Sequence, residues 1–181
     1  MNTKLNKDLT VYFSKERIDT RVKEIASQLS NKFSGKCPVI IGVLNGSFIF
    51  LSDLVRLFDF DCEIDFVKAN SYVGKESSGK VKLDKDVSID INNRRVILVE
   101  DIIDSGLTME FLYEHILSFN PKDITIVTLL SKLSKKNNYK FNFKIDFIGF
   151  EIDSDFVVGY GLDLNHKYRN LDSLYGLNGK N

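Results

Sequence analysis

Hydrophobic residues recur along the chain with two different periods, and each period predicts one kind of element. From 18 to 33, apolar side chains fall every three or four positions, which predicts an amphipathic helix. Ser14 precedes this pattern as a candidate N-cap, and Gly35 ends it. Two shorter stretches with the same spacing predict further helices, one over 48–58 and one over about 107–119. In the first of these, the end residues Phe48 and Phe58 are both expected to face inward.

Other segments carry the signals of strands. Runs that are almost wholly apolar predict buried strands, and they cover 38–44, 95–99, 124–130 and 146–150. Residues 62–70 alternate instead, so the even positions are expected inside and the odd ones, including Asp65, outside. The tail from Gly159 is expected to be irregular. Because strands and helices alternate, we predict an α/β fold with a mainly parallel twisted sheet flanked by helices.

Composition and charge exclude several classes of protein. The 181 residues are 43% hydrophobic and 28% charged, as in ordinary globular domains, and 25 basic residues balance 25 acidic ones. This balance argues against a dedicated nucleic-acid binder. There is no signal-peptide core and no apolar run long enough to cross a membrane. Cys37 and Cys62 are expected to be buried free thiols. We therefore expect a cytoplasmic protein with no nucleic-acid or membrane partner.

Three carboxylates, those of Glu100, Asp101 and Asp104, directly follow a predicted buried strand. In parallel α/β sheets, ligands bind outside the carboxyl ends of the strands. The small residues 105–106, the hydroxyl of Thr108 and the start of a helix would make a cradle for one phosphate. The pattern is neither a Walker A loop nor a dinucleotide fingerprint. The alternative is a capped turn with solvated carboxylates, although carboxylates this close need a cation or hydroxyl donors.

The run VILVEDIIDSGLT at 96–108 resembles the phosphoribosyl pyrophosphate-binding motif of type I phosphoribosyltransferases. The run FVVGYGLD at 156–163 is similar to the hypoxanthine (hypoxanthine-guanine) branch of that family, which acts on 6-oxopurines. Three further segments share this similarity, at 71–72, 146–151 and 168–171. The resemblance extends over about residues 10–172, nearly the whole chain.

The resemblance implies a single phosphoribosyltransferase domain over 1–181, with a core at about 36–150 and a small hood from about 1–13 and 151–181. It implies Mg²⁺-dependent transfer of the 5-phosphoribosyl group from phosphoribosyl pyrophosphate to N9 of hypoxanthine and/or guanine. The products would be IMP or GMP and pyrophosphate, and the protein would be a homodimer or homotetramer. The sequence does not rank hypoxanthine, guanine and xanthine as substrates. A nucleotide-sensing relative without catalysis is the alternative, which the balanced charge and the intact candidate residues disfavour.

One contiguous segment would hold the ribose phosphate in such a protein. Asp104 would be the general base near N7 of the purine. Glu100 and Asp101 would hold the ribose hydroxyls and contribute to the metal site. The resemblance implies five further substrate-binding positions here: Ile102, Ser105, Gly106, Leu107 and Thr108.

Residues further along the chain would bind the base, the metal and the pyrophosphate. Phe156 would stack on the purine, Val157 would offer backbone groups to its edge, and Lys132 would donate to its exocyclic oxygen. Asp163 would associate with Mg²⁺. Arg169 would contact pyrophosphate, which its bidentate fork suits. Taken singly, a core phenylalanine, a solvated lysine and a turn aspartate are the ordinary alternatives.

Two loops complete the implied site. Leu44, Asn45 and Gly46 would bind pyrophosphate, and the family carries a non-proline cis peptide here, which we expect between Leu44 and Asn45. Some relatives have a basic residue where Asn45 stands, so backbone N–H groups would make that contact in this chain. Ser71 and Tyr72 would begin a catalytic lid that runs to about residue 79 and excludes water from the reaction.

Overall fold

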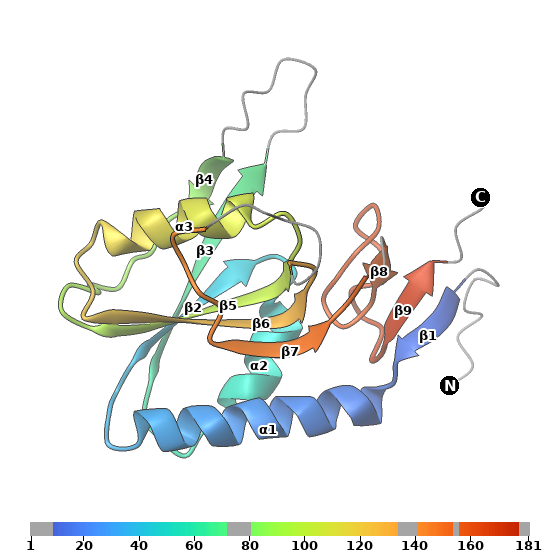
Figure 1. Cartoon of the computed structure of the whole chain (residues 1–181), viewed down its shortest axis with the longest axis horizontal. Coiled ribbons are helices and arrows are strands. Elements are labelled where there is room, and N and C mark those ends of the chain that lie inside the picture. The colour runs from blue at the N-terminus through green and yellow to red at the C-terminus, as the bar shows by residue number, and fades with distance from the viewer. Residues whose placement is uncertain (1–8, 72–80, 134–140, 154–155, 178–181) are drawn as a thin grey trace.

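The computed structural model describes residues 9–71, 81–133, 141–153 and 156–177. A six-stranded sheet lies at its centre (Figure 1). Its strand order is β4-β3-β2-β5-β6-β7. The strands are β2 (Val39–Leu44), β3 (Glu63–Ser71), β4 (Val81–Lys85), β5 (Arg95–Ile103), β6 (Asp123–Ser131) and β7 (Phe147–Glu151). The pairing is parallel throughout except for β3 with β4. The predicted mainly parallel α/β sheet is therefore confirmed, and the parallel strands bring their carboxyl ends to one edge.

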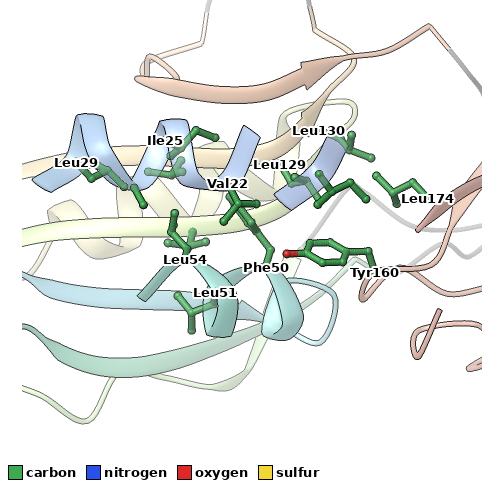
Figure 2. Packing of buried hydrophobic residues seen from close by; sticks show 14 of the residues in the cluster. Val22, Ile25, Leu29, Phe50, Leu51, Leu54, Leu129, Leu130, Tyr160 and Leu174 are labelled. Carbon is green, nitrogen blue, oxygen red and sulfur yellow. The ribbon is translucent and has the colours of Figure 1, made fainter. Parts of the chain in front are cut away.

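Helices cover both faces of this sheet (Figure 1). The long helix α1 (Lys15–Phe33) and the short helix α2 (Phe48–Val55) pack on one face, and α3 (Leu107–Leu117) packs on the other. Ser14 caps α1 as predicted, because its hydroxyl accepts a hydrogen bond from the backbone N–H of Arg17 at 3.4 Å. Figure 2 shows the core on the α1 side, where side chains of both helices meet those of β6 and of the C-terminal segment.

A second, three-stranded antiparallel sheet joins the two ends of the chain, in the order β1-β9-β8. Its strands are β1 (Leu9–Phe13), β8 (Val157–Val158) and β9 (Leu174–Leu177). The expectation of an irregular tail after Gly159 is therefore wrong at β9. The backbone of β9 pairs with strands that are distant in sequence, and a local pattern of hydrophobic residues cannot reveal such pairing.

Several predicted boundaries are also corrected. Helix α2 ends at Val55, so Phe58 lies outside it, and Phe48 is 43% exposed instead of facing inward. Helix α3 ends two residues early, at Leu117. Cys37 is exposed and only Cys62 is partly buried. Cys37 lies in the polar connection before β2, so the apolar run beside it does not cover the thiol.

The expected orientation of β3 is reversed at Asp65, which is buried while Ile64 is exposed. The carboxylate of Asp65 accepts hydrogen bonds from the backbone N–H groups of Phe66, Ser88 and Ile89, at 2.7, 2.5 and 3.2 Å. The Lys85 ammonium also donates to it, at 2.9 Å. Burial alone would raise the pKa of Asp65, but these donors outweigh it and hold the pKa well below the ordinary value. Asp65 therefore fixes the chain that follows β4 against β3.

Replacing Asp65 with asparagine is expected to lower the free energy of unfolding at pH 7 by about 3 kcal/mol, because an amide nitrogen would meet backbone N–H donors. The low pKa gives stability that is present above the unfolded-state pKa, about 4, and is lost as pH falls through the folded-state pKa. The gap between wild type and Asp65→Asn should therefore shrink below about pH 4. Denaturant unfolding at several pH values measures this gap. The exposed Asp59→Asn is the control, and a gap that does not change with pH would contradict the role of the carboxylate.

Candidate functional site

The turn between β5 and α3 forms a small cavity. Gly106 ends this turn with φ +81°, and a methyl group on it would lie 2.4 Å from Cζ of Phe141, so both conformation and space require glycine. The cavity has a volume of about 100 Å³ and is lined by Glu100, Ile102, Ile103, Asp104, Ser105, Gly106, Thr108 and Met109. The first N–H groups of a helix point out of its N-terminus, and that end attracts anions. The cavity therefore suits one phosphate group.

Glu100 and Asp101 lie on the last part of β5, which extends past the predicted end at Val99. Both side chains are buried, at 8% and 9% exposure, and the backbone N–H of Asp101 donates to Glu100 Oε1 at 3.1 Å. Burial and the neighbouring Asp101 carboxyl raise the pKa of Glu100 well above its ordinary value. Solvated carboxylates are therefore excluded for this pair. Two buried acids side by side favour a cation or hydroxyl donors as their ligand.

Asp104 and Lys132 lie together at the ends of neighbouring strands. Lys132 follows β6, and its backbone N–H donates to the carbonyl of Ile103 at 2.9 Å. Its ammonium lies 3.2 Å from Asp104 Oδ2. The Asp104 carboxylate is 68% exposed, whereas Lys132 is 16% exposed, so Lys132 is not a solvated surface lysine. The pair places one acid and one cation beside the cavity.

The loop after β2 packs directly on the acidic pair. The peptide bond between Leu44 and Asn45 is cis, as predicted. A methyl group on Gly46 would lie 1.6 Å from Asp101 Oδ2, so the backbone of Gly46 touches that carboxylate. A methyl group on Gly161 would lie 2.1 Å from the carbonyl oxygen of Gly46. Three segments distant in sequence therefore meet here. Gly161 was not among the predicted site residues. The two glycines on either side of Tyr160 could have indicated a place where the backbone packs closely against another segment.

The C-terminal segment contributes a second ion pair. Arg169 Nη2 lies 2.6 Å from Asp163 Oδ1, and Arg169 Nη1 donates to the carbonyl of Gly161 at 2.6 Å. The backbone N–H of His166 donates to Asp163 at 2.7 Å. These contacts hold the predicted metal and pyrophosphate residues next to each other, beside the loop that contains Gly46.

Phe156 and Val157 begin the C-terminal segment in opposite environments. Phe156 is 61% exposed, which excludes the alternative of a core phenylalanine, whereas Val157 is buried in β8. The segment follows β7, whose last residue, Glu151, pairs with Ser131, the residue before Lys132. Phe156 and Lys132 therefore both follow the paired ends of β6 and β7.

The predicted lid is only partly described. Ser71 is the last residue of β3 and pairs with Val81 of β4. Tyr72 and the rest of the lid to residue 79 lie outside the described residues.

The chain matches the phosphoribosyl transferase domain family over residues 11–165. It is 42% identical over 171 residues to a hypoxanthine-guanine phosphoribosyltransferase of Aquifex aeolicus, covering 93% of this chain and 94% of the relative. It is 37% identical over 161 residues to a hypoxanthine-guanine-xanthine phosphoribosyltransferase of Tritrichomonas foetus, covering 89% of this chain and 87% of the relative. A crystal structure of a hypoxanthine-guanine phosphoribosyltransferase from Bacillus anthracis matches with a TM-score of 0.85 at 43% identity, over 93% of this chain and 98% of that one. The chain therefore belongs to the phosphoribosyl transferase family.

Proposed function

We propose that this protein is a purine-salvage enzyme that transfers the 5-phosphoribosyl group of phosphoribosyl pyrophosphate to N9 of hypoxanthine and/or guanine. The observation that carries the proposal is the buried pair of Glu100 and Asp101, which directly precedes a phosphate-sized cavity at the end of β5. An acidic pair beside an anion cradle suits a ligand that presents sugar hydroxyls next to a phosphate. The names of the similar relatives support the same substrates.

The ribose phosphate would bind along the end of β5. The turn 104–108 would hold the 5-phosphate through backbone N–H groups and the helix end. Glu100 and Asp101 would accept hydrogen bonds from the ribose hydroxyls, and Ile102, which lines the cavity, would contact the ribose phosphate. The loop 44–46 and Arg169 would face the pyrophosphate. Asn45 carries no charge, so backbone groups of this loop would supply its contacts.

The purine would bind where β6 and β7 end. Phe156 presents an exposed ring for stacking, and the backbone of Val157 would meet the edge of the base. Lys132 would donate to the exocyclic oxygen of a 6-oxopurine, once it shifts from its partner Asp104. Asp104 would then be available to take the proton at N7 and to stabilise the positive charge that develops on the ribose.

The acidic residues fit Mg²⁺. Among the described residues there is no cluster of three or more side chains that could form a closed metal site. Mg²⁺ is ordinarily held by one or two carboxylates together with substrate phosphates and water, which matches Glu100 and Asp101. From the C-terminal segment, Asp163 would associate with the ion. When bound, the ion would neutralise charge on the pyrophosphate leaving group.

The wider organisation is proposed from the same family membership. The core would span about 36–150, and residues 1–13 and 151–181 would form a hood that contains the sheet β1-β9-β8. We also propose a homodimer or homotetramer in the cytoplasm. In the part of the chain that the structure describes, no helix is both long and apolar enough to cross a membrane.

The proposal is tested by a spectrophotometric assay with phosphoribosyl pyrophosphate and hypoxanthine, guanine, xanthine or adenine in turn. We expect nucleotide formation with hypoxanthine or guanine, none with adenine, and loss of turnover when Mg²⁺ is removed by a chelator. The absence of turnover with every 6-oxopurine would refute the proposed function. Strong use of adenine would refute the role of Lys132.

A further inference from the structure

Three consecutive residues of the C-terminal segment adopt an unusual backbone conformation. Gly159, Tyr160 and Gly161 all have positive φ, at 98°, 47° and 103°. A non-glycine residue rarely adopts this region, so surrounding contacts must hold Tyr160 there. The backbone N–H of Tyr160 donates to the carbonyl of Leu171 at 2.8 Å, and that of Gly161 donates to the carbonyl of Arg169 at 2.9 Å. The turn 159–161 is thus tied to the segment that contains Arg169.

The side chain of Tyr160 connects this turn to α2. It is 3% exposed and belongs to the core shown in Figure 2. Its hydroxyl donates to Asp53 Oδ2 at 2.7 Å, and the other oxygen of Asp53 pairs with Arg56. Burial and the Asp53 carboxylate raise the pKa of Tyr160 far above its ordinary value, so the hydroxyl remains a donor. This hydrogen bond is partly buried, and a hydrogen bond to a charged acceptor is among the stronger ones in proteins.

The next residue, Gly161, contacts two candidate pyrophosphate-binding elements. Its α-carbon packs against the carbonyl of Gly46, because a methyl group there would lie 2.1 Å from that oxygen. Its own carbonyl accepts a hydrogen bond from Arg169 at 2.6 Å. A displacement of the turn 159–161 would therefore change two contacts of Gly161, the one with the loop 44–46 and the one with the guanidinium of Arg169.

We infer that Tyr160 is a positioning residue for the pyrophosphate end of the site. Its hydrogen bond to Asp53 fixes the turn 159–161, and the turn in turn holds Gly46 and Arg169 in place. The ring of Tyr160 lies in the core and acts through its neighbours. This inference rests on the proposed function, because it assumes that the loop 44–46 and Arg169 bind pyrophosphate.

The test is Tyr160→Phe, which removes the hydroxyl and keeps the buried ring. We expect KM for phosphoribosyl pyrophosphate, and KM for pyrophosphate in the reverse reaction, to rise about fivefold, equivalent to about 1 kcal/mol of binding. KM for hypoxanthine should not change, because the hydrogen bond between Tyr160 and Asp53 does not involve the proposed base-binding residues Phe156, Val157 and Lys132. Tyr175→Phe, which removes a hydroxyl from another buried tyrosine, is the control and should leave all three KM values unchanged.

A second variant, Asp53→Ala, removes the acceptor without altering the core ring, and it should reproduce the selective rise in KM. Asp53→Asn keeps an acceptor oxygen and should restore most of the affinity. Equal changes in the KM values of base and pyrophosphate, or no change in either variant, would overturn the inference. If the wild type shows no turnover, the proposed function fails. If the wild type is active and both variants have its KM values, only the inference about Tyr160 fails.

Discussion

Replacing Asp104 with asparagine is expected to lower the turnover number about 100- to 1000-fold, the lower part of the usual contribution of a general base. Asparagine matches aspartate in size but cannot take a proton or stabilise positive charge on the ribose. The backbone groups of the cradle stay in place, so KM for phosphoribosyl pyrophosphate should change much less. The carboxylate is largely exposed, and its ion pair is with Lys132, a side chain at the same site, so the fold should tolerate the change.

Steady-state kinetics with the two substrates varied separately measure this effect. Asp90→Asn is the control, because Asp90 is exposed and its Oδ1 accepts from the backbone N–H of Asn92, which an amide oxygen can also do. It should match wild type in every parameter. Unchanged turnover in Asp104→Asn would remove Asp104 from the mechanism. An equal loss of turnover and of phosphoribosyl pyrophosphate binding would assign it to binding instead.

Replacing Gly46 with alanine is expected to reduce kcat/KM about 100-fold, or about 2.7 kcal/mol, near the upper end of what overpacking costs. The added methyl would lie 1.6 Å from Asp101 Oδ2, so either the carboxylate or the loop must move. Gly161 lies against the carbonyl oxygen of Gly46, so the loop has little room to move in that direction. The change therefore displaces a proposed ribose and metal ligand or a proposed pyrophosphate contact, and both raise KM for phosphoribosyl pyrophosphate.

Gly176→Ala is the matched control, because among the described residues a methyl group there would meet only Tyr12 Cδ2, at an ordinary 3.9 Å. It should retain wild-type kinetics. Titration calorimetry measures binding of phosphoribosyl pyrophosphate with Mg²⁺, and thermal unfolding of the same variant separates a lost ligand site from a general loss of folding. Wild-type binding by Gly46→Ala would show that the loop and Asp101 are not held together as the structure indicates.

Most of the core elements were predictable because their signals are local. The helical period of α1 and the apolar runs of β2, β5, β6 and β7 each lie within one segment of sequence. The small cavity after β5 was predictable for the same reason, since its lining comes from one short run, 100–109, that continues into the first turn of α3. The antiparallel sheet β1-β9-β8 was not, because its stability comes from pairing between the two ends of the chain.

Single side chains resisted prediction where a distant partner decides their environment. The alternating pattern predicts Asp65 on the surface, yet it is buried because the backbone N–H groups of Ser88 and Ile89 donate hydrogen bonds to its carboxylate. The bond between Tyr160 and Asp53 spans 107 positions in sequence, and no local pattern indicates it. The burial of Glu100 likewise depends on the strands on either side of β5. These interactions can be recognised only once the sheet order is known.

The antiparallel pairing of β1 with β9 has a mechanical consequence. Leu9 pairs with Leu177, so both described ends of the chain leave from the same point. A force that pulls these ends apart would load the hydrogen bonds of β1 and β9 one after another, as in a zipper, instead of shearing them together. The small sheet would therefore peel open first, and with it β8 and Val157, while the six-stranded sheet is still intact. An unfolding motor that grips the C-terminal end of this chain would therefore disrupt β8, where the proposed purine contact Val157 lies, before it reaches the main core.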